Sequence, residues 1–234
     1  MLSTPDPASS QQQLIEAKDH QAQYLHSLKS LKQRGSIQLI LGTMFAGKST
    51  ELLRRIRMLE LADKRILRVK YQADCRYDNE AAIATHTGQK LTAVPVTTLS
   101  ELGDSWKAFD VVGIDEGQFF SDLVWFAEMC ANHQKIVIIS SLQGTFHRTA
   151  WQSITDLIPL CEKVTKLSAI CKLCKQAASF TYRTADKNVK NMIGGAEMYM
   201  PLCRVCHLRE TALNQQNVFE GNPQIVEKTP AIEK

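Results

Sequence analysis

The 234-residue sequence contains no long apolar run and no strong excess of charge of either sign. Its apolar stretches, such as Ile136–Ile139, are far shorter than the roughly 20 residues of a membrane-spanning helix, so we expect no membrane partner. The net charge of +4 is weak and the basic residues are dispersed, which does not favour a nucleic-acid partner. The N-terminal region shows no basic segment followed by an apolar core, so we expect no secretory signal and a cytoplasmic protein.

Cysteine is present seven times, and four of the seven form two C-x-x-C pairs, Cys171 with Cys174 and Cys203 with Cys206. Without an export signal the compartment is expected to be reducing, where paired cysteines are more often metal ligands than disulfides. Four thiolates can bind zinc tetrahedrally in a closed structural site. Two alternatives stay open at this point, a disulfide and haem attachment to Cys203, Cys206 and His207. Haem would leave the first pair unexplained. Cys75, Cys130 and Cys161 are expected to be ordinary thiols.

The central part of the chain alternates between short apolar stretches and segments with helical spacing. We expect strands at 37–41, 65–71, 91–96, 111–114, 135–140 and 163–167, and helices at 51–61, 123–132 and 156–162. This alternation is typical of a parallel sheet that is covered on both faces, in an α/β fold. The polar stretch 72–90 is expected to form a loop.

The ends of the chain have a different composition. We expect residues 1–34 to be an N-terminal extension, loosely attached or forming an amphipathic partner-binding helix, and residues 212–234 to be a disordered tail. Between them the sequence predicts a nucleotide-binding domain over 35–168. A small cysteine-stapled domain is predicted over 169–211, where the pattern changes to cysteine pairs, glycines and short polar stretches.

The segment 42–49 is a complete G-x-x-x-x-G-K-[ST] phosphate-binding loop that follows an apolar strand and precedes a helix. Glycines allow the backbone to curve around an anion, and the helix N-terminus adds a favourable dipole. The lysine can reach the β- and γ-phosphates, while the serine can hold Mg²⁺. The candidate phosphate and magnesium residues of this loop are Gly42, Thr43, Met44, Phe45, Ala46, Gly47, Lys48 and Ser49.

Asp115 and Glu116 directly follow the predicted strand 111–114. An acid at this position of a phosphate-loop protein holds Mg²⁺, directly or through water. Two consecutive acids repel each other when buried, and a cation at Asp115 would relieve that repulsion. Glu116 could then act as a general base toward a hydroxyl group, or orient water as in an ATPase. The pair of acids by itself does not separate these roles.

Four motifs in this order resemble those of the type II thymidine kinases, the zinc-containing cytosolic class that is also found in bacteria. They are GTMFAGKST at 42–50, DEGQFF at 115–120, LQGTFHR at 142–148 and IGGA at 193–196, together with the two cysteine pairs. The resemblance extends from about residue 36 to 210. It implies a RecA-like domain with a mostly parallel sheet, and a small zinc-ribbon-like domain that carries a long loop, the lasso.

The resemblance also implies an activity. Members of this family transfer the γ-phosphate of ATP to the 5′-hydroxyl of thymidine, or of deoxyuridine, in the salvage of DNA precursors. It implies Mg²⁺ with ATP, a structural Zn²⁺, a homotetramer and feedback by thymidine triphosphate. The alternative from another class is a nucleic-acid-dependent ATPase in which the cysteine domain is a binding ribbon, and a second is a catalytically silent zinc scaffold. The complete set of Lys48, Ser49, Asp115 and Glu116 argues against the scaffold.

Individual roles follow from the resemblance position by position. Glu116 would be the catalytic base, while Asp74, Arg76, Asp115 and Gln118 would act with the loop on the phosphates and Mg²⁺. Trp151 lies where many relatives have phenylalanine, so it could narrow the pocket near the base or only repack it. The residues implied at the nucleoside are Met44, Phe119, Leu142, Phe146, Trp151, Thr181 and Tyr199, together with the lasso residues Lys190, Asn191, Met192, Ile193 and Gly194.

Overall fold

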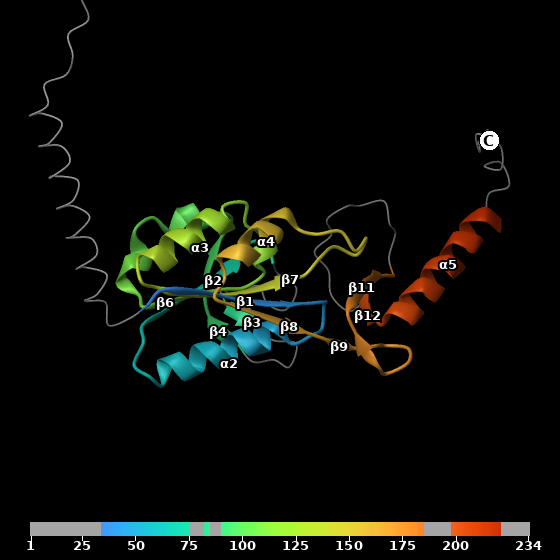
Figure 1. Cartoon of the computed structure of the whole chain (residues 1–234), viewed down its shortest axis with the longest axis horizontal. Coiled ribbons are helices and arrows are strands. Elements are labelled where there is room, and N and C mark those ends of the chain that lie inside the picture. The colour runs from blue at the N-terminus through green and yellow to red at the C-terminus, as the bar shows by residue number, and fades with distance from the viewer. Residues whose placement is uncertain (1–33, 75–81, 85–89, 185–197, 221–234) are drawn as a thin grey trace, which may run out of the picture. The chain divides into compact units, whose positions relative to one another are not determined.

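The structure is a computed structural model that describes residues 34–74, 82–84, 90–184 and 198–220 (Figure 1). The chain divides into two units between Arg34 and Gly35, and the description below concerns the second unit. The N-terminal extension expected over 1–34 lies outside the described residues, except for its last residue. Arg76 and the lasso residues 190–194 also lie outside them.

A six-stranded sheet forms the centre of this unit. Its strand order is β5 (Val94–Val96), β2 (Ile66–Tyr71), β6 (Val111–Ile114), β7 (Ile136–Leu142), β1 (Ser36–Gly42) and β8 (Lys163–Leu167). Every neighbouring pair in the sheet is parallel, which confirms the predicted α/β class. The register pairs Gly42 with Leu142 and Ile114 with Ile139, so the segments after β1, β6 and β7 emerge at one edge.

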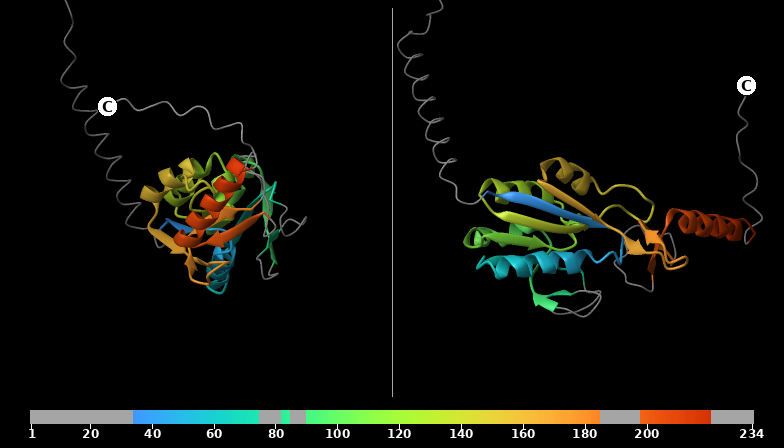
Figure 2. Two further views of the ribbon diagram at one scale, coloured as in Figure 1. Left: turned by 90° about the vertical axis from the view of Figure 1, so that its right-hand side faces the viewer. Right: turned by 60° about the horizontal axis from the view of Figure 1, so that its bottom comes forward.

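Alternate residues of the central strands bury opposite faces of the sheet. Ile40 and Ile138 pack with α2 (Lys48–Glu60) in one apolar cluster. Their neighbours Leu39 and Ile139 belong to a second cluster with α3 (Leu123–Asn132) and α4 (Gln152–Leu157). The period of two in a strand sends successive side chains to opposite faces, so the central strands are apolar along most of their length. Figures 1 and 2 show α2 on one face and α3 and α4 on the other.

Gly113 of β6 allows α2 to approach the sheet closely. A Cβ atom at this position would lie 2.5 Å from Cδ1 of Ile56, a buried residue of α2. This contact is far too short for two carbon atoms, so a side chain at position 113 would force the buried Ile56 side chain to move. The helix that packs here begins directly after the phosphate-binding loop.

The structure corrects several expected boundaries. The helix expected over 51–61 begins at Lys48, directly after the loop. The helix expected over 156–162 is α4 at Gln152–Leu157, and a 3-10 turn, Ile158–Leu160, follows it. Pro159 lies within that turn, and proline has no N–H with which to continue an α-helix.

The strand expected over 91–96 is two strands. β4 (Lys90–Thr92) pairs with β3 (Ala82–Ala84), which lies inside the stretch expected to be a loop, whereas β5 joins the main sheet. Buried Ala93 separates β4 and β5. Pro95 is accommodated in β5 because this strand lies at an edge of the sheet, where a missing N–H is tolerated.

After β8 the chain forms a second, smaller set of elements. Two antiparallel pairs, β9 (Ala169–Ile170) with β10 (Ala177–Ala178) and β11 (Phe180–Arg183) with β12 (Tyr199–Leu202), precede α5 (Arg204–Glu220). The small core of this part consists of Ala169, Cys171, Ala178, Tyr182, Leu202 and Cys206.

The helix α5 extends through residues 212–220, where a disordered tail was expected. This stretch contains good helix formers such as Ala212 and Leu213, and the next proline is Pro223. The rest of the tail lies outside the described residues. Among the described helices, none has both the length and the apolar character that crossing a membrane requires.

Candidate functional site

The phosphate-binding loop lies between β1 and α2, as the sequence predicts. Two of its residues have positive φ angles, 65° at Phe45 and 78° at Gly47, which curves the backbone tightly before the helix begins. The Lys48 side chain is buried, and its Nζ donates to the Thr43 carbonyl oxygen at 3.0 Å. The first N–H groups of a helix have no partner within the helix and attract anions. The loop and the buried lysine therefore form a site suited to phosphate.

Asp115 lies at the end of β6, beside this loop. Its Oδ1 accepts a hydrogen bond from Ser49 Oγ at 3.1 Å, one from Glu116 N at 3.1 Å and one from Ser140 Oγ of β7. The structure thus brings together the serine and the acid to which the sequence analysis assigned Mg²⁺. Hydroxyl and carboxylate oxygens are the donors that Mg²⁺ prefers, so these residues fit that ion.

The electrostatics of Asp115 also fit a cation. Burial, together with the negative charges of Glu116 and Asp74, raises the pKa of Asp115 to about 6, although hydrogen bonds from Ser140 and Ser49 act in the opposite direction. The two neighbouring acids therefore disfavour the charged form of Asp115. A divalent cation would offset this repulsion and keep Asp115 ionised.

Glu116 is buried and has φ 54° and ψ 44°, a left-handed conformation that residues other than glycine rarely adopt. Such strain concentrates at functional sites, where it directs a side chain. A short 3-10 turn, Gly117–Phe119, follows. Gln118 in this turn donates from Nε2 to Glu116 Oε2 at 2.5 Å. Its Oε1 accepts from Ser141 Oγ at 2.9 Å and from Leu142 N at 3.0 Å.

Aromatic residues predicted at the nucleoside lie in two groups. In the first, Phe119 contacts Trp151 with ring centroids 6.0 Å apart, and its other neighbour is Tyr71 of β2 at 5.1 Å. In the second, the Arg183 guanidinium lies 5.2 Å from the Phe146 ring centroid and 5.9 Å from that of Tyr199. Flat apolar faces of this kind suit a pyrimidine base.

Thr181 of β11 connects the cysteine-bearing part to the phosphate-binding loop. Its Oγ1 lies 2.6 Å from Thr43 Oγ1 and accepts a hydrogen bond from Met44 N at 3.1 Å. All three residues are buried. Thr181 was predicted at the nucleoside, and in the structure its hydroxyl contacts the loop backbone beside Met44. The two regions of the predicted site are therefore joined directly.

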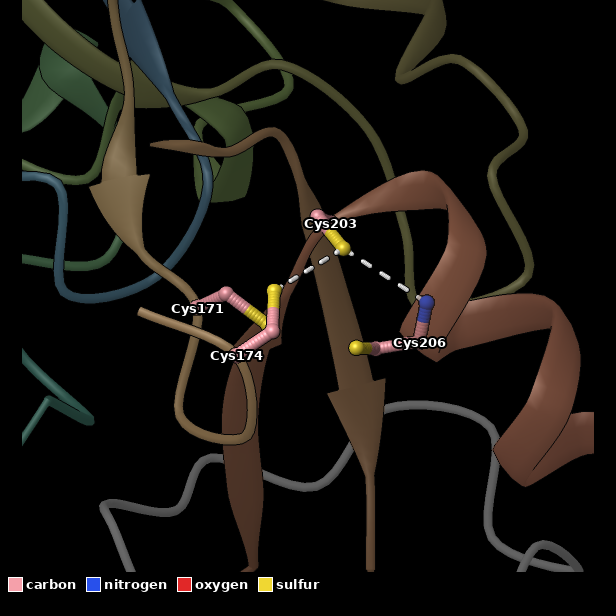
Figure 3. A group of neighbouring side chains, drawn as sticks. All are labelled: Cys171, Cys174, Cys203 and Cys206. Carbon is pink, nitrogen blue, oxygen red and sulfur yellow. Dashed lines mark hydrogen bonds between the residues drawn. The ribbon is translucent and has the colours of Figure 1, made fainter. Parts of the chain in front are cut away.

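The four paired cysteines converge in space, as the sequence predicts (Figure 3). Cys171 and Cys174 lie in the turn after β9, while Cys203 follows β12 and Cys206 lies in the first turn of α5. Their Sγ atoms all lie within 4.8 Å of one another, and those of Cys174 and Cys203 are 3.5 Å apart. This is the arrangement of a four-thiolate metal site, and it fits zinc. The described cysteines form no disulfide.

The electrostatics of the sulfur atoms support this assignment. Burial would raise the pKa of Cys171, but hydrogen bonds from the backbone near Cys174, Cys203 and Leu173 lower it to about 6. Burial and the three neighbouring cysteines raise the pKa of Cys206 to about 12. Four thiolates are therefore difficult to ionise together unless a cation binds them.

Sequence reasoning missed several residues at this edge of the sheet. Ser140 bonds to Asp115 and Ser141 bonds to Gln118 because β7 lies beside β6, and no motif indicated this. Tyr71 and Arg183 join the aromatic groups in the same way, through the ends of β2 and β11. Tyr71 is the last residue of a predicted strand, and this position at a strand end was the one signal that could have indicated a residue of the site.

Comparison with known proteins gives a consistent result. A family model described as "Thymidine kinase" matches residues 35–207. The cytosolic thymidine kinase of Cricetulus griseus is 43% identical over 182 residues, which cover 78% of this chain and 77% of that protein. The thymidine kinase of Raccoon poxvirus is 45% identical over 176 residues, which cover 75% of this chain and 98% of that protein.

The similarity to solved structures is weaker than the similarity to these two relatives. The flagellar accessory protein FlaH from Methanocaldococcus jannaschii matches 62% of this chain and 76% of its own, with a TM-score of 0.43 and 14% identity. This similarity is too low to support an argument about function. The family model spans the phosphate-binding loop, the two acids and all four paired cysteines, and together with the two relatives it shows that the chain belongs to the thymidine kinase family.

Proposed function

We propose that this protein is a thymidine kinase, which transfers the γ-phosphate of ATP to the 5′-hydroxyl of thymidine and yields thymidine monophosphate. Family membership over residues 35–207 supports this reaction. The structural observation that carries it is the hydrogen bond from Ser49 of the phosphate-binding loop to Asp115, the residue directly before Glu116. Deoxyuridine is proposed as a second acceptor.

ATP would bind with its phosphates on the loop 42–49, where Lys48 and the backbone N–H groups offset their charge. Ser49, Asp115 and Asp74 would hold Mg²⁺, which supplies charge neutralisation at the β- and γ-phosphates. Arg76 is proposed to add positive charge in the transition state. The repulsion among the acids around Asp115 supports a cation at this place.

Glu116 is proposed as the general base. As the 5′-hydroxyl oxygen bonds to the γ-phosphorus, the hydroxyl proton passes to the Glu116 carboxylate and the bond from the γ-phosphorus to the bridging oxygen of ADP breaks. The left-handed backbone of Glu116 and its hydrogen bond from Gln118 support a directed side chain. The alternative, in which Glu116 orients a water molecule, would give ATP hydrolysis instead.

Thymidine would bind between the phosphate-binding loop and the cysteine-bearing part, a position that the contacts of Thr181 with Thr43 and Met44 support. The aromatic groups around Phe119 and Phe146 would contact the base. The lasso residues 190–194 would read the polar edge of the base with backbone groups and exclude water. The remaining residues proposed at the nucleoside are Leu142, Trp151 and Tyr199.

The four cysteines are proposed to bind a structural zinc ion, which would hold the two ends of the lasso segment at one point. Convergence of the four Sγ atoms supports this role.

We also propose the division into domains at 35–168 and 169–211, a homotetramer, feedback by thymidine triphosphate and a cytoplasmic location. The last is supported by the relatives named as cytosolic.

One assay tests the proposed function against its rivals. The purified protein is incubated with γ-labelled ATP, Mg²⁺ and a panel of nucleosides, with and without DNA. We expect label in thymidine monophosphate, less in the product from deoxyuridine and no effect of DNA. DNA-stimulated release of labelled phosphate without a nucleotide product would instead indicate the ATPase. The absence of both products in a folded, metal-loaded protein would contradict both activities.

A further inference from the structure

Gln118 connects Glu116 to strand β7. Its side chain is buried, and both ends of its amide are engaged. Nε2 donates to Glu116 Oε2 at 2.5 Å, while Oε1 accepts from Ser141 Oγ at 2.9 Å and from Leu142 N at 3.0 Å. The sequence resemblance placed this glutamine with the phosphates and Mg²⁺. In the structure it bridges the predicted base and the neighbouring strand.

The orientation of the amide is determined by its surroundings. A backbone N–H can only donate, so the group that faces Leu142 N must be the amide oxygen. The NH₂ group must therefore point to Glu116, whose carboxylate can accept it. The Ser141 hydroxyl, which is completely buried, donates to the same amide oxygen and adds a second constraint on its position.

The two acids are thus connected to consecutive residues of one strand. Ser140 donates directly to Asp115, and Ser141 reaches Glu116 through Gln118. β7 is a central strand of the sheet and pairs with β6 and β1. Side chains that are held by a rigid element retain their geometry better than those held only by a loop. The arrangement connects a strained loop residue, Glu116, to the middle of the sheet.

We propose that Gln118, held by Ser141 and the Leu142 N–H group, is a positioning residue that fixes the Glu116 carboxylate for its reaction. This inference rests on the proposed role of Glu116 as the base. Gln118 keeps its hydrogen bond to Oε2, so that Oε1 is directed to the nucleoside hydroxyl. A misplacement of about 1 Å in a reacting group can cost roughly 100-fold in rate, which sets the scale of the effect.

The first test is Gln118→Glu, which keeps the shape of the side chain but replaces the donor by a carboxylate oxygen. We expect kcat for thymidine phosphorylation to fall about 10- to 100-fold. The KM for thymidine should stay within about twofold of the wild-type value, since no contact with the nucleoside is lost. The added negative charge beside Glu116 alters Mg²⁺ binding by itself, so the ATP and Mg²⁺ dependence is compared in the uncharged variant Ser141→Ala, where a metal or phosphate contact of Gln118 would change it.

The matched control is Gln152→Glu on the exposed surface of α4. Gln152 Nε2 also donates to a carboxylate, Asp156 Oδ1, at 2.7 Å. The same chemical change is therefore made at a pair outside the site. We expect kcat to be unchanged in this control, and thermal unfolding of both variants is followed to verify that they are folded.

A second variant, Ser141→Ala, keeps the donor to Glu116 and removes only one of the two groups that hold the amide oxygen. We expect a smaller fall in kcat, about 2- to 10-fold, with both KM values unchanged. This variant introduces no charge. It therefore serves as the measurement if Gln118→Glu fails to fold, and an unchanged kcat in folded Ser141→Ala protein then overturns the inference.

A double-mutant cycle separates positioning from a general structural role. In a Glu116→Gln background there is no carboxylate to position, so adding Gln118→Glu should cause little further loss of kcat. Full additivity, or a normal kcat in Gln118→Glu alone, would overturn the inference. If the wild-type protein forms no thymidine monophosphate, the proposed function itself has failed. If the wild-type protein is active but kcat does not change on substitution of Gln118, only the inference about Gln118 has failed.

Discussion

The phosphate-binding edge of the sheet and the cysteine-bearing part after β8 are stabilised by different means. The sheet buries two apolar clusters, one on each face, with residues such as Leu39 and Ile40 completely inaccessible. The cysteine-bearing part has one small cluster, and two of its six buried members, Cys171 and Cys206, are themselves cysteines of the predicted metal site. Apolar burial can sustain the first region, whereas the second is too small to fold well without a further constraint.

The two regions also carry different groups of the proposed site. The groups proposed to handle phosphate and the proton are attached to the rigid sheet through loops after β1, β6 and β7. Several groups proposed at the nucleoside lie on β11 and β12, which lead to the cysteine site. Loss of the metal should therefore disturb the groups proposed to bind the nucleoside before it disturbs those proposed to bind phosphate. The hydrogen bonds of Thr181 with Thr43 and Met44 are where a disturbance would pass from one region to the other.

Removal of the metal should give the largest effect. Chelation, or Cys203→Ser, is expected to unfold the cysteine-bearing part, because structural zinc sites contribute about 10 kcal/mol or more to folding. The sheet should remain folded, since its core contains none of these cysteines. Limited proteolysis and thermal unfolding measure the two regions separately, with the isolated thiol variant Cys161→Ser as the control. A metal-free protein with unchanged stability and activity would contradict a structural metal.

Replacement of the proposed base should give the next largest effect and act only on the chemical step. Glu116→Gln keeps the size of the side chain and is expected to lower kcat by about 10²- to 10⁴-fold, because a general base typically contributes that factor. ATP binding, measured by calorimetry, should be retained since the phosphate-binding loop is unchanged. Near-normal thymidine phosphorylation by this variant would exclude Glu116 as the base.

The pH dependence of stability should differ with and without Mg²⁺. Burial raises the pKa of Asp115 from 3.8 to about 6, so the folded protein retains this proton where the unfolded chain has lost it. Without Mg²⁺, the free energy of unfolding should therefore decrease as the pH rises from about 4 to 6, by up to roughly 1 kcal/mol per pH unit. Urea unfolding measures this, and Asp115→Asn should abolish the decrease. If saturating Mg²⁺ leaves the decrease intact, Asp115 is not a ligand.

The smallest effect is expected at the connection between the two regions. Thr181→Val removes the hydroxyl that accepts from Met44 N, and one such hydrogen bond contributes about 1 kcal/mol to stability. We expect a modest decrease in thermal stability and a rise in the KM for thymidine. Thr155→Val is the control, because the Thr155 hydroxyl donates to the carbonyl oxygen of Trp151, one turn earlier at the start of α4. Equal effects of the two substitutions on KM would show that Thr181 does not link the regions.

Sequence patterns were most reliable where the cause of the structure is local. The loop 42–49, the strand 111–114 and the helix 123–132 lie where the pattern predicted them, because glycine placement and apolar periodicity act over a few residues. Boundaries were predicted less well where neighbouring elements decide them. The division of 91–96 into β4 and β5, and the earlier start of α4, depend on which strand or helix lies alongside.

The sequence by itself determined the chemistry of this protein: a phosphate-binding loop, two consecutive acids and four cysteines are recognisable because residue type and spacing define them. Only the tertiary structure decided how the acids are held. Strand order places Ser140 and Ser141 beside Asp115 and Gln118, and β11 brings Thr181 to Met44. These residues are far apart in the chain, and side-chain hydrogen bonds between distant residues leave no periodic trace in a single sequence. Parallel pairing of β6 with β7 is the physical reason that the two serines meet Asp115 and Gln118.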